Sequence, residues 1–488
     1  MINIKNYNYI GALTSKPYAF KARSWELQSM ESIDLFDSLG STIKLDLKGS
    51  EIVRILPINN KYINDEWLSD KSRYAYDGLK RWRFIHPMIK KNNVFIQTSW
   101  KNTFDYINEK ITNIKYNNII INTGNYTDLE SIVVLQKFAD NFNNVIINPN
   151  YNFNVDIQNY SLEVEPIKAS SKVFIFIGIN TRVENPVLNI RLKKLSLQKN
   201  YLFAFIGTKF DNNINSFHLG NSIKILKKIY QGKNNFVLMI KNFLKKNIKN
   251  NFKLPINIVL GKDFYKRTNK NFNYLNKNFS TLKTYYNILF DSIGQINIAE
   301  LGFFTTKTFT TTFPNLYYLL GTEYISNIKN DDLVIFQGHH NDKLRLNFNV
   351  ILPTTNWTEK SSIHINCLGF IEKTYVITTP PKLTRIDWKI IRMISILFNV
   401  DVKYTNISEI HLHLNKLSPN ITSSINNLNF TKKYNIIYKS VSKKYTFFDN
   451  NPFIFQTPNY YLTNALERSS KVMLECYNIL EKKRNNFI

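Results

Sequence analysis

Five short apolar runs, each closed by a glycine, constrain the fold of this chain more than any other feature. Helical segments separate these runs, and continuously apolar strands of this length are typical of parallel sheets covered on both faces. Two shorter runs, at 119–121 and 145–147, flank a helical segment and predict one βαβ unit. We therefore predict an α/β fold with doubly wound parallel sheets. The five runs are residues 173–178, 202–207, 256–261, 316–321 and 333–338.

Several helix starts can be placed from capping residues. Thr127 and Glu130 have the spacing of a capping box for a helix that runs through Ala139. Asn185 followed by Pro186 has the pattern of an N-cap and first helical position, which predicts a helix over 187–194. The apolar spacing after Ser99 predicts another amphipathic helix.

A small mixed unit precedes the α/β region. Apolar and polar residues alternate over 43–47, Gly49 and Ser50 supply a turn, and residues 51–56 return as a second strand. This pattern predicts an antiparallel hairpin with one buried face.

The later part of the chain continues the α/β pattern, and residues 406–450, rich in Asn, Ser and Lys, are the poorest candidate for compact structure. We divide the chain into a small β unit (1–82), a Rossmann-like α/β region (83–330) and a C-terminal α/β region with an Asn/Lys-rich tail (331–488). Beyond residue 338 we expect strands at 350–352 and 364–373 and helices at 387–398 and 472–480.

The chain has 64 Lys and Arg against 36 Asp and Glu, a formal net charge of +28. Such an excess is typical of proteins that bind a polyanion. The lysines are scattered, however, and Asn, Ile, Phe and Tyr, which share A/T-rich codons with Lys, are abundant too. A codon-biased organellar genome explains the charge equally well. No stretch approaches the roughly 18 apolar residues of a spanning helix, so we expect no direct membrane span.

Candidate chemical groups are few. His339 and His340 follow the strand end at 338, where α/β folds place ligands, but adjacent histidines favour a turn or surface role. Glu409, His411 and His413 alternate and would share one face of a strand, the minimum for a two-His-one-carboxylate metal site, although nothing nearby supports one.

The two cysteines also argue against chemistry by this chain. Cys367 lies in an apolar, strand-like segment, where a buried inert thiol is expected, and Cys476 lies on the C-terminal helix. Two cysteines 109 positions apart form neither a disulfide framework nor a CxxC metal site. We therefore predict no catalytic residue and no metal ligand.

Long strings in the sequence resemble the largest iron-sulfur subunit of the peripheral arm of respiratory complex I. They occur in the order of that family and cover nearly the whole chain. They are GALTSKPYAFKARSWELQSMESIDLFDSLGS (11–41), INDEWLSDKSRYAYDGLKRWR (63–83), IGINTRVENPVLNIRLKK (177–194), LVIFQGHHND (333–342), VILPTTNWTEK (350–360), TPPKLTRIDWKIIR (379–392) and PNYYLTNALERSSKVMLEC (458–476).

The resemblance implies a molybdopterin-oxidoreductase-like fold whose cofactor site is degenerate. The sequence has no cysteine where a metal ligand would follow the small unit and no glycine-rich nucleotide cradle. The family's Asn-Thr-Glu-Gly-Arg run is replaced by Asn366-Cys367-Leu368-Gly369-Phe370, without its charges. This departure suggests a position that is free to drift.

In this family a cluster cysteine directly precedes the string that begins at Gly11, but Asn8, Tyr9 and Ile10 stand there. The resemblance thus implies that the 2Fe-2S and 4Fe-4S clusters belong to a separate cysteine-rich chain, the N-terminal half of a split subunit, and that this chain binds no cofactor.

The implied role is structural: the chain supports NADH to ubiquinone electron transfer by scaffolding and shielding the iron-sulfur half. Other peripheral-arm subunits would be partners, on the matrix side of the mitochondrial inner membrane, and the gene would be mitochondrial. Residues that could pack beside a neighbouring 4Fe-4S cluster are Gly11, Leu13, Thr14, Lys16 and Arg23.

Two alternatives from other classes stay open. One is a catalytically active molybdopterin oxidoreductase, which would require a metal and a pterin. The other is a basic organellar nucleic-acid-binding protein, whose binding would weaken steeply with salt. We expect neither.

Overall fold

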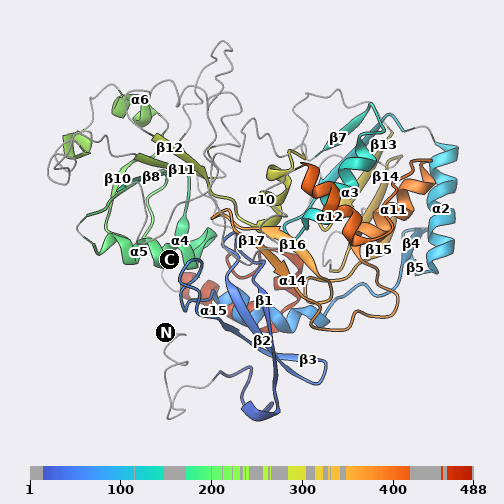
Figure 1. The fold of residues 1–488 in the computed structure, drawn as a ribbon, viewed down its shortest axis with the longest axis horizontal. Helices are drawn as coiled ribbons and strands as arrows, with labels where there is room; N and C mark the ends of the chain where they lie inside the picture. The colour runs from blue at the N-terminus through green and yellow to red at the C-terminus, as the bar shows by residue number, and fades with distance from the viewer. Residues whose placement is uncertain are drawn as a thin grey trace.

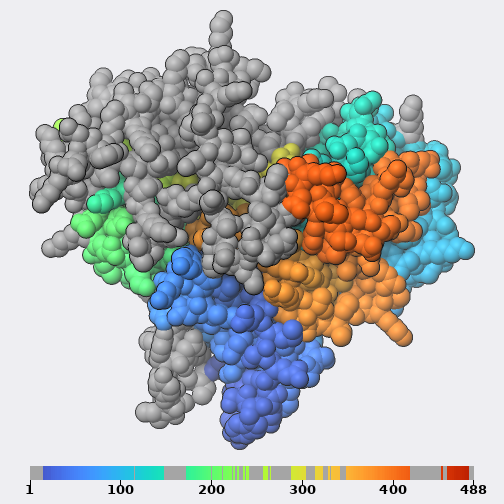
Figure 2. Space-filling view, viewed as in Figure 1, coloured from blue at the N-terminus to red at the C-terminus, as the bar shows by residue number. Residues whose placement is uncertain are grey.

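The computed structural model has an α/β body with two parallel-stranded sheets and a small antiparallel sheet that projects from it (Figure 1). In the space-filling view the N-terminal unit, in blue, extends away from the rest of the molecule (Figure 2). The predicted α/β class with parallel sheets is therefore confirmed. The structure describes residues 15–114, 116–147, 172–198, 200–211, 213–222, 224–230, 235–236, 238–240, 256–261, 264, 284–303, 314–322, 328–329, 331–340, 348–417, 452–453 and 459–485.

The projecting sheet has the strand order β1-β2-β3. β2 (Thr42–Lys48) and β3 (Glu51–Pro57) form the predicted hairpin. β1 (Gln28–Ile33) adds a third strand that the sequence pattern does not reveal, because its first four residues are exposed and only its last two are buried. The turn helix η2 (Ser24–Glu26) precedes this sheet, and α1 (Asp70–Tyr74) and η3 (Ala75–Lys80) follow it.

A seven-stranded sheet has the order β5-β4-β15-β14-β13-β6-β7. Its five strands from β15 to β7 are parallel, and the β4–β5 hairpin adds an antiparallel edge. β13 and β14 are buried along their whole length, as the continuous apolar runs predict. The strands are β4 (Met88–Lys91), β5 (Val94–Gln97), β6 (Asn118–Thr123), β7 (Val145–Ile147), β13 (Asn315–Leu320), β14 (Leu333–Gly338) and β15 (Val350–Pro353).

Four helices pack beside this sheet. The predicted starts near Ser99 and Asp387 are confirmed, and α3 contacts both α11 and α12. α12 lies within the segment 406–450 that we expected to be least compact, and that expectation is wrong for its eleven residues; residues 418–450 lie outside the described ones. The helices are α2 (Trp100–Asn113), α3 (Leu129–Ala139), α11 (Asp387–Leu397) and α12 (Ile407–Leu417).

A five-stranded, wholly parallel sheet has the order β10-β9-β8-β11-β12. Aromatic side chains stack across its neighbouring strands: the ring centroids of Phe174 and Phe203 are 5.3 Å apart, and those of Phe176 and Phe205 are 4.8 Å apart. The strands are β8 (Val173–Ile177), β9 (Leu202–Ile206), β10 (Ser216–Gly220), β11 (Ile256–Leu260) and β12 (Thr284–Ile288). Helices α4 (Thr181–Glu184), α5 (Pro186–Ser196) and α6 (Lys224–Tyr230) lie between its strands in sequence, and α10 (Ile293–Glu300) follows β12 and contacts α3 and β16.

Asn185 stands at the predicted N-cap of α5, but its side chain makes no capping hydrogen bond. Its Oδ1 accepts from the Ser38 hydroxyl at 2.8 Å, and its Nδ2 donates to the Phe290 carbonyl oxygen at 3.2 Å. The position of the helix start is therefore confirmed, whereas the capping role is wrong. Asn185 instead links the loop after β1 to the five-stranded sheet.

The two large sheets are interleaved in sequence. β8 to β12 lie between β7 and β13, which both belong to the seven-stranded sheet. Strands on both sides of residue 330 therefore pair in one sheet. The division of the chain at residues 82 and 330 stays a prediction about its units.

Residues 364–373 do not form the single strand that we predict. They belong to a hairpin of β16 (Ser362–Ile365) and β17 (Ile371–Thr374), which pair antiparallel. The turn between them is held by Asn366, whose Oδ1 accepts from the backbone N–H groups of Leu368 and Phe370 at 3.0 and 2.9 Å. The hydrogen bonds of Asn366 give this turn a defined structure, and the expectation that the run 366–370 is free to drift stays a prediction.

The C-terminal helices pack on the N-terminal unit, where α14 and α15 contact η3 and α15 also contacts α1. α14 (Ala465–Ser469) and α15 (Lys471–Asn485) confirm the predicted terminal helix. The Ser469 hydroxyl donates to the Gly78 carbonyl oxygen at 3.0 Å, and Met473 is fully buried in the same core as Leu45.

Candidate functional site

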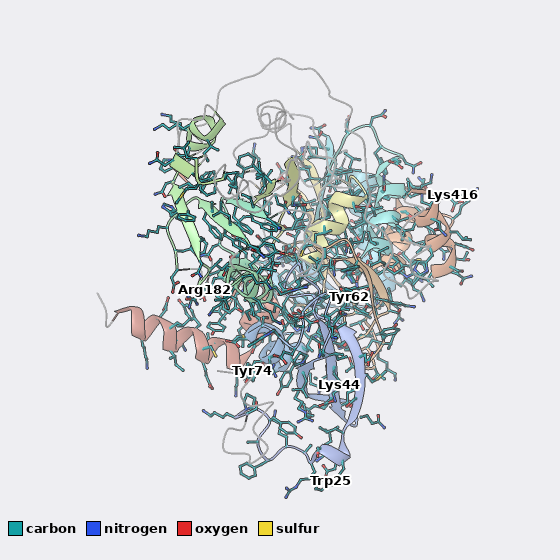
Figure 3. All side chains as sticks on the ribbon, turned by 60° about the vertical axis from the view of Figure 1, so that its left-hand side comes forward. Trp25, Lys44, Tyr62, Tyr74, Arg182 and Lys416 are labelled. Atoms are coloured by element: carbon teal, nitrogen blue, oxygen red, sulfur yellow. The ribbon has the colours of Figure 1, made fainter. Side chains whose placement is uncertain are left out.

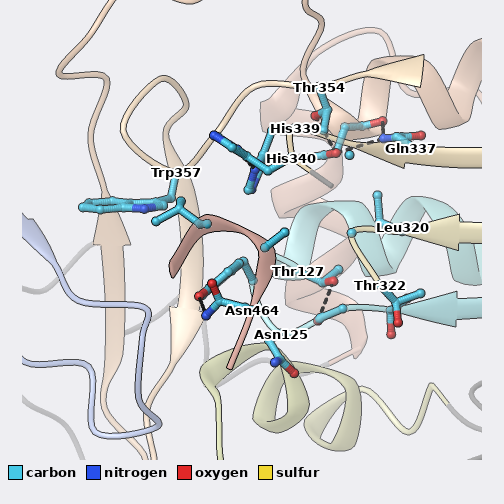
Figure 4. Close-up of a pocket in the computed structure, with 18 of the residues that line it drawn as sticks. Asn125, Thr127, Leu320, Thr322, Gln337, His339, His340, Thr354, Trp357 and Asn464 are labelled. Carbon is cyan, nitrogen blue, oxygen red and sulfur yellow. Dashed lines mark hydrogen bonds between the residues drawn. The ribbon is translucent and has the colours of Figure 1, made fainter. Parts of the chain in front are cut away.

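A cavity of about 300 Å³ lies at the carboxyl ends of β6, β13, β14 and β15 (Figure 4). In open parallel sheets this edge is where ligands bind. The start of α14 forms one of its walls. Residues that line it include Gly124, Asn125, Tyr126, Thr127, Ser131, Gly321, Gln337, His339, His340, Thr354, Thr355, Trp357, Lys360, Asp387 and Asn464.

The ends of β6 and β13 approach so closely beside the cavity that position 124 requires glycine. A Cβ atom on Gly124 would overlap the carbonyl oxygen of Gly321. The backbone N–H of Gly124 also donates to the Leu320 carbonyl oxygen at 2.8 Å. Gly124 is therefore needed so that the ends of β6 and β13 can pack closely.

α3 begins at Asp128, whose Oδ1 accepts from the backbone N–H of Ser131 at 2.9 Å. The predicted capping box of Thr127 and Glu130 is therefore wrong. Asp128 caps the helix one residue later than predicted, since Asp is as good an N-cap as Thr. Glu130 instead accepts from the backbone N–H of Ile363 at 3.1 Å and holds α3 against the β16–β17 hairpin.

Lys360 lies between two carboxylates at the cavity wall. Its Nζ is 2.5 Å from an oxygen of Asp128 and 2.5 Å from an oxygen of Asp387, and all three side chains are at most 7% exposed. Burial alone would lower the pKa of Lys360, but the attraction of the two carboxylates outweighs it and the pKa is raised. Burial likewise pushes the pKa of Asp128 upward, and Lys360 reverses this to a lowered pKa. One lysine between two carboxylates gives the group a formal net charge of −1.

Asp387 joins this group to the loops that form the cavity. The Thr354 hydroxyl donates to its carboxylate at 2.6 Å, and the Gln337 amide donates to it at 2.9 Å. These bonds tie the ends of β14 and β15 to the first residue of α11. One buried carboxylate thus holds the ends of two of the strands at the cavity against α11.

His339, which is half-buried, and His340, which is buried, line the cavity side by side. Their Nδ1 atoms are 2.6 Å apart, and His340 Nε2 is 3.0 Å from the Gly78 carbonyl oxygen. Burial, followed by the charge of Arg83, lowers the pKa of His340 to about 4. Burial and the neighbouring histidine hold the pKa of His339 well below its ordinary value. A surface role is wrong for His340, which the N-terminal unit covers, whereas His339 is half-buried in the bend after β14, in keeping with the turn alternative.

Glu409, His411 and His413 do not share a strand face, because they lie on helix α12. His411 Nε2 is 3.1 Å from the Glu130 carboxylate, and the His413 ring packs edge-on against Tyr404. Within the part of the chain that the structure describes, no three His, Cys, Asp or Glu side chains are placed to hold a metal ion.

Cys367 is buried, as predicted, and burial raises the pKa of its thiol to about 12. It lies in the turn between β16 and β17 rather than within a strand. Cys476 lies on α15 and is partly exposed. A thiol that stays protonated is a poor nucleophile and metal ligand.

The residues predicted to pack beside an iron-sulfur cluster are only partly described. Gly11, Leu13 and Thr14 lie outside the described residues. Lys16 and Arg23 are exposed in the N-terminal arm, and the Arg23 guanidinium lies 5.9 Å from the Trp25 ring centre. Their role beside a cluster stays a prediction.

Sequence reasoning missed most residues of the cavity. Tyr126, Trp357 and Asn464 come from three distant segments, and the Tyr126 hydroxyl accepts from the Asn464 amide. The sequence did contain a pattern that predicts the position of the cavity, since a Gly followed by polar residues stands at the end of each of β6, β13 and β14. Nothing in the sequence near α14 predicted that the start of this helix would line the cavity.

Two family models match the chain. Residues 83–396 match the model described as molybdopterin oxidoreductase. Residues 27–77 match the model described as the NADH-ubiquinone oxidoreductase NDSU1/NuoG-like 4Fe-4S domain.

The curated proteins to which the chain is similar are named as proteins of NADH-ubiquinone oxidoreductase or NADH dehydrogenase. The chain is 34% identical to the NADH-ubiquinone oxidoreductase 75 kDa subunit of Reclinomonas americana, over 96% of this chain and 71% of that protein. It is 31% identical to the mitochondrial NADH dehydrogenase [ubiquinone] iron-sulfur protein 1 of Solanum tuberosum, over 97% and 64%. It is 30% identical to the mitochondrial NADH-ubiquinone oxidoreductase 78 kDa subunit of Candida albicans, over 99% and 68%. The chain thus spans about two thirds of the length of these relatives.

Among solved structures, acetylene hydratase from Pelobacter acetylenicus is similar with a TM-score of 0.51 and 11% identity, over 76% of this chain and 69% of that one. At this identity the likeness shows the fold alone. The predicted molybdopterin-oxidoreductase-like fold is confirmed by this likeness and by the match of residues 83–396.

The cavity does not fit the phosphate-bearing pterin cofactor that this fold implies. Lys360 is the only Lys or Arg among the described residues that line the cavity, and two carboxylates hold it. Phosphate groups would therefore meet a net negative charge without a free cation. The lining also offers no cysteine to a metal.

The match to a 4Fe-4S domain does not bring cluster ligands either. No cysteine lies between residues 27 and 77, and the whole sequence has two, at 367 and 476. A 4Fe-4S cluster held by cysteine thiolates requires four. The identity along nearly the whole chain and the two family models nevertheless agree, and the chain belongs to the family of the 75 and 78 kDa subunits of NADH-ubiquinone oxidoreductase.

Proposed function

We propose that this chain is a structural part of the peripheral arm of respiratory complex I. It supports NADH to ubiquinone electron transfer by scaffolding and shielding an iron-sulfur half, and it is an enzyme only as part of that complex. The observation that carries the proposal is 34% identity over 96% of the chain to a relative named for this oxidoreductase. The lack of cluster cysteines supports the division of labour.

The clusters belong, in this proposal, to a separate cysteine-rich polypeptide that corresponds to the N-terminal half of the subunit. The N-terminal arm supports such a contact. Phe20 is fully exposed and Trp25 is 78% exposed, and Trp25 lies at the far tip of the N-terminal unit (Figure 3). Exposed aromatic residues are typical of protein interfaces.

Two separate halves lack the covalent link that would keep their effective concentration high. Their interface must therefore be permanent, and we expect it to bury more than roughly 2,000 Å². The chain should consequently not accumulate as a free folded monomer. Abundant free monomer in matrix extracts would contradict this part of the proposal.

The proposed location is the matrix side of the mitochondrial inner membrane, with a mitochondrial gene. Mitochondrial relatives support it. Among the described residues, no helix combines the length and the apolar character needed to cross a bilayer. Attachment to the membrane would then come through the other subunits of complex I.

Gly11, Leu13, Thr14, Lys16 and Arg23 are proposed to pack beside the 4Fe-4S cluster of the partner. Charge near a cluster changes its reduction potential. Exchange of Arg23 for glutamine should therefore lower the potential of one cluster in a redox titration followed by electron paramagnetic resonance. Exchange of the distant Arg182, which pairs with Asp211 at 3.0 Å, is the matched control and should leave all potentials unchanged.

The assembly is tested by native electrophoresis of detergent-solubilised mitochondria, with in-gel NADH dehydrogenase staining and peptide mass spectrometry of the active band. We expect this chain in that band in equal amount with a cysteine-rich polypeptide. Migration with ribosomes would instead favour a nucleic-acid-binding role, and molybdenum or tungsten in the purified chain would favour a pterin enzyme.

A further inference from the structure

The tautomers of the two cavity histidines are fixed by their neighbours. The Gly78 carbonyl oxygen can only accept, so His340 Nε2, 3.0 Å away, carries the proton. His340 is uncharged at neutral pH, and its Nδ1 is therefore an acceptor. His339 Nδ1, 2.6 Å from that atom, must then carry the proton of the second ring.

His339 consequently presents an unprotonated Nε2. Within the described part of the chain, no donor reaches this nitrogen. Two buried hydroxyls of the same cavity, those of Ser131 and Thr355, also have no hydrogen-bond partner among the described residues. Ser131 is 1% exposed and Thr355 is 3% exposed. Buried polar atoms are nearly always paired, so these two hydroxyls point to a ligand or bound solvent, and His339 Nε2 adds an acceptor beside them.

The charges around the cavity select against anions. Lys360 is neutralised by Asp128 and Asp387, with one negative charge in excess. Arg83, whose charge also acts on the two histidines, donates two hydrogen bonds to the Glu359 carboxylate. A phosphate or carboxylate would have to displace one of these buried pairs, which is unfavourable.

The cavity also has aromatic walls. The Tyr126 ring lies 6.5 Å from the His339 ring at an angle of 29° between their planes, and Trp357 lines the same space. Flat molecules gain most from such walls, because ring faces contact one another over a large area. At about 300 Å³, the volume suits a small molecule of one or two rings.

We propose that this cavity binds a small, uncharged, planar molecule of the amide type. Its N–H group donates to His339 Nε2, its carbonyl oxygen accepts from the Thr355 or Ser131 hydroxyl, and its ring packs against Tyr126 and Trp357. The site excludes anionic molecules of the same shape. This inference is independent of the structural role proposed above.

Benzamide and benzoate are a matched pair for the test, since they share a planar ring and differ in charge and in N–H donors. The full chain, in the assembly from which it is purified, is titrated with each compound and binding is followed by saturation-transfer difference NMR. We expect benzamide to bind with a dissociation constant on the order of 1 mM and benzoate at least about tenfold more weakly. Equal binding of the two compounds, or no binding of benzamide, overturns the proposal.

Variants locate the site. H339F keeps a ring but removes the acceptor, so we expect a benzamide affinity about tenfold lower, or more. H413F, on the outer helix α12, is the control and should leave the affinity unchanged. Benzamide affinity that is unaltered in H339F places binding elsewhere and overturns the proposal.

T355V keeps the inference testable even where H339F does not fold. Valine has nearly the shape of threonine, and the Thr355 hydroxyl has no partner to lose among the described residues. The stability of the chain should therefore hardly change, while benzamide binds several-fold more weakly. Unchanged affinity in both T355V and the corresponding S131A variant contradicts the proposed contacts.

Discussion

At the residue scale, replacing Lys360 by methionine would leave Asp128 and Asp387 buried without their cation. Both carboxylates lie 2.5 Å from the lysine nitrogen in a site that is at most 7% exposed. Removal of one partner from such a buried group typically costs about 3–5 kcal/mol. We expect K360M to lower the free energy of unfolding by that amount, measured by denaturant unfolding of the full chain.

A matched lysine is available on the surface. Lys194 is 65% exposed and lies 3.2 Å from Asp65. Exposed pairs contribute at most about 1 kcal/mol, so K194M should change the free energy of unfolding by no more than that. A similar loss of unfolding free energy in K360M and K194M would show that Lys360 and its two carboxylates stabilise the fold less than their burial indicates.

Asp34 gives a pH dependence. Burial, and then the nearby charge of Asp37, raises the pKa of Asp34 from 3.8 to about 8, although Lys71 and the hydrogen bonds from Ser72 and the backbone act in the opposite direction. In the unfolded chain Asp34 loses its proton near its ordinary pKa. The folded state therefore holds the proton more tightly, and its contribution to stability falls as the pH rises from about 4 to about 8.

D34N removes this dependence. Asparagine keeps the acceptor for the Phe36 N–H, which lies 3.0 Å from Asp34 Oδ1. The unfolding free energy of D34N should consequently fall less than that of the wild type between pH 5 and pH 8, by denaturant titrations at several pH values. D105N, on the exposed side of α2, should follow the wild type.

At the scale of the single element, helix α2 owes its start to one side chain. Ser99 accepts from the backbone N–H of Asn102 at 3.2 Å. Loss of such a cap costs about 1 kcal/mol. S99A should speed hydrogen exchange of the first turn of α2, measured by mass spectrometry, while T112A at the other end of the helix should not. Equal protection of the first turn in S99A and wild type would exclude a capping role.

The elements that the sequence predicts well are those with one clear period. β13 and β14 are buried throughout and apolar apart from Asn315 and Gln337, and the β2–β3 hairpin alternates as half-buried strands do. The strand prediction for Glu409, His411 and His413 failed because these residues alternate like strand residues. The core residues of α12 are Ile410 and Leu414, spaced four apart, which is the period of a helix.

The site was less predictable than the strands that carry it. The carboxyl ends of β6, β13 and β14 were recognisable, but the pairing of Lys360 with Asp128 spans 232 positions. Local sequence patterns do not predict such contacts, because the contacts form only when distant strands pair. For the same reason the burial of His340 could not be predicted from its neighbours in sequence.

At the scale of the whole molecule, both ends of the described chain form one core. Leu45 of the projecting sheet, Leu466 of α14 and Met473 of α15 belong to the same buried cluster. Lys71 and Glu467 add an ion pair of 3.6 Å across this contact. The C-terminal helices therefore serve as part of the N-terminal unit, and the unit should not be stable without them.

G78A tests this dependence. A Cβ atom at position 78 would overlap the Leu466 carbonyl oxygen and lie 2.7 Å from the Ser469 hydroxyl, so α14 has to move away. Overpacking of this kind costs about 1–3 kcal/mol. We expect limited proteolysis to cleave the segment from Ala465 onward faster in G78A than in the wild type.

G49A is the control, since a Cβ atom there meets nothing within 4 Å and strains only the turn between β2 and β3. The Gly78 carbonyl also fixes the tautomer of His340, so G78A should weaken benzamide binding together with the docking of α14. G49A should alter neither. If the C-terminal segment of G78A resisted protease as it does in the wild type, the two ends of the chain would not depend on each other.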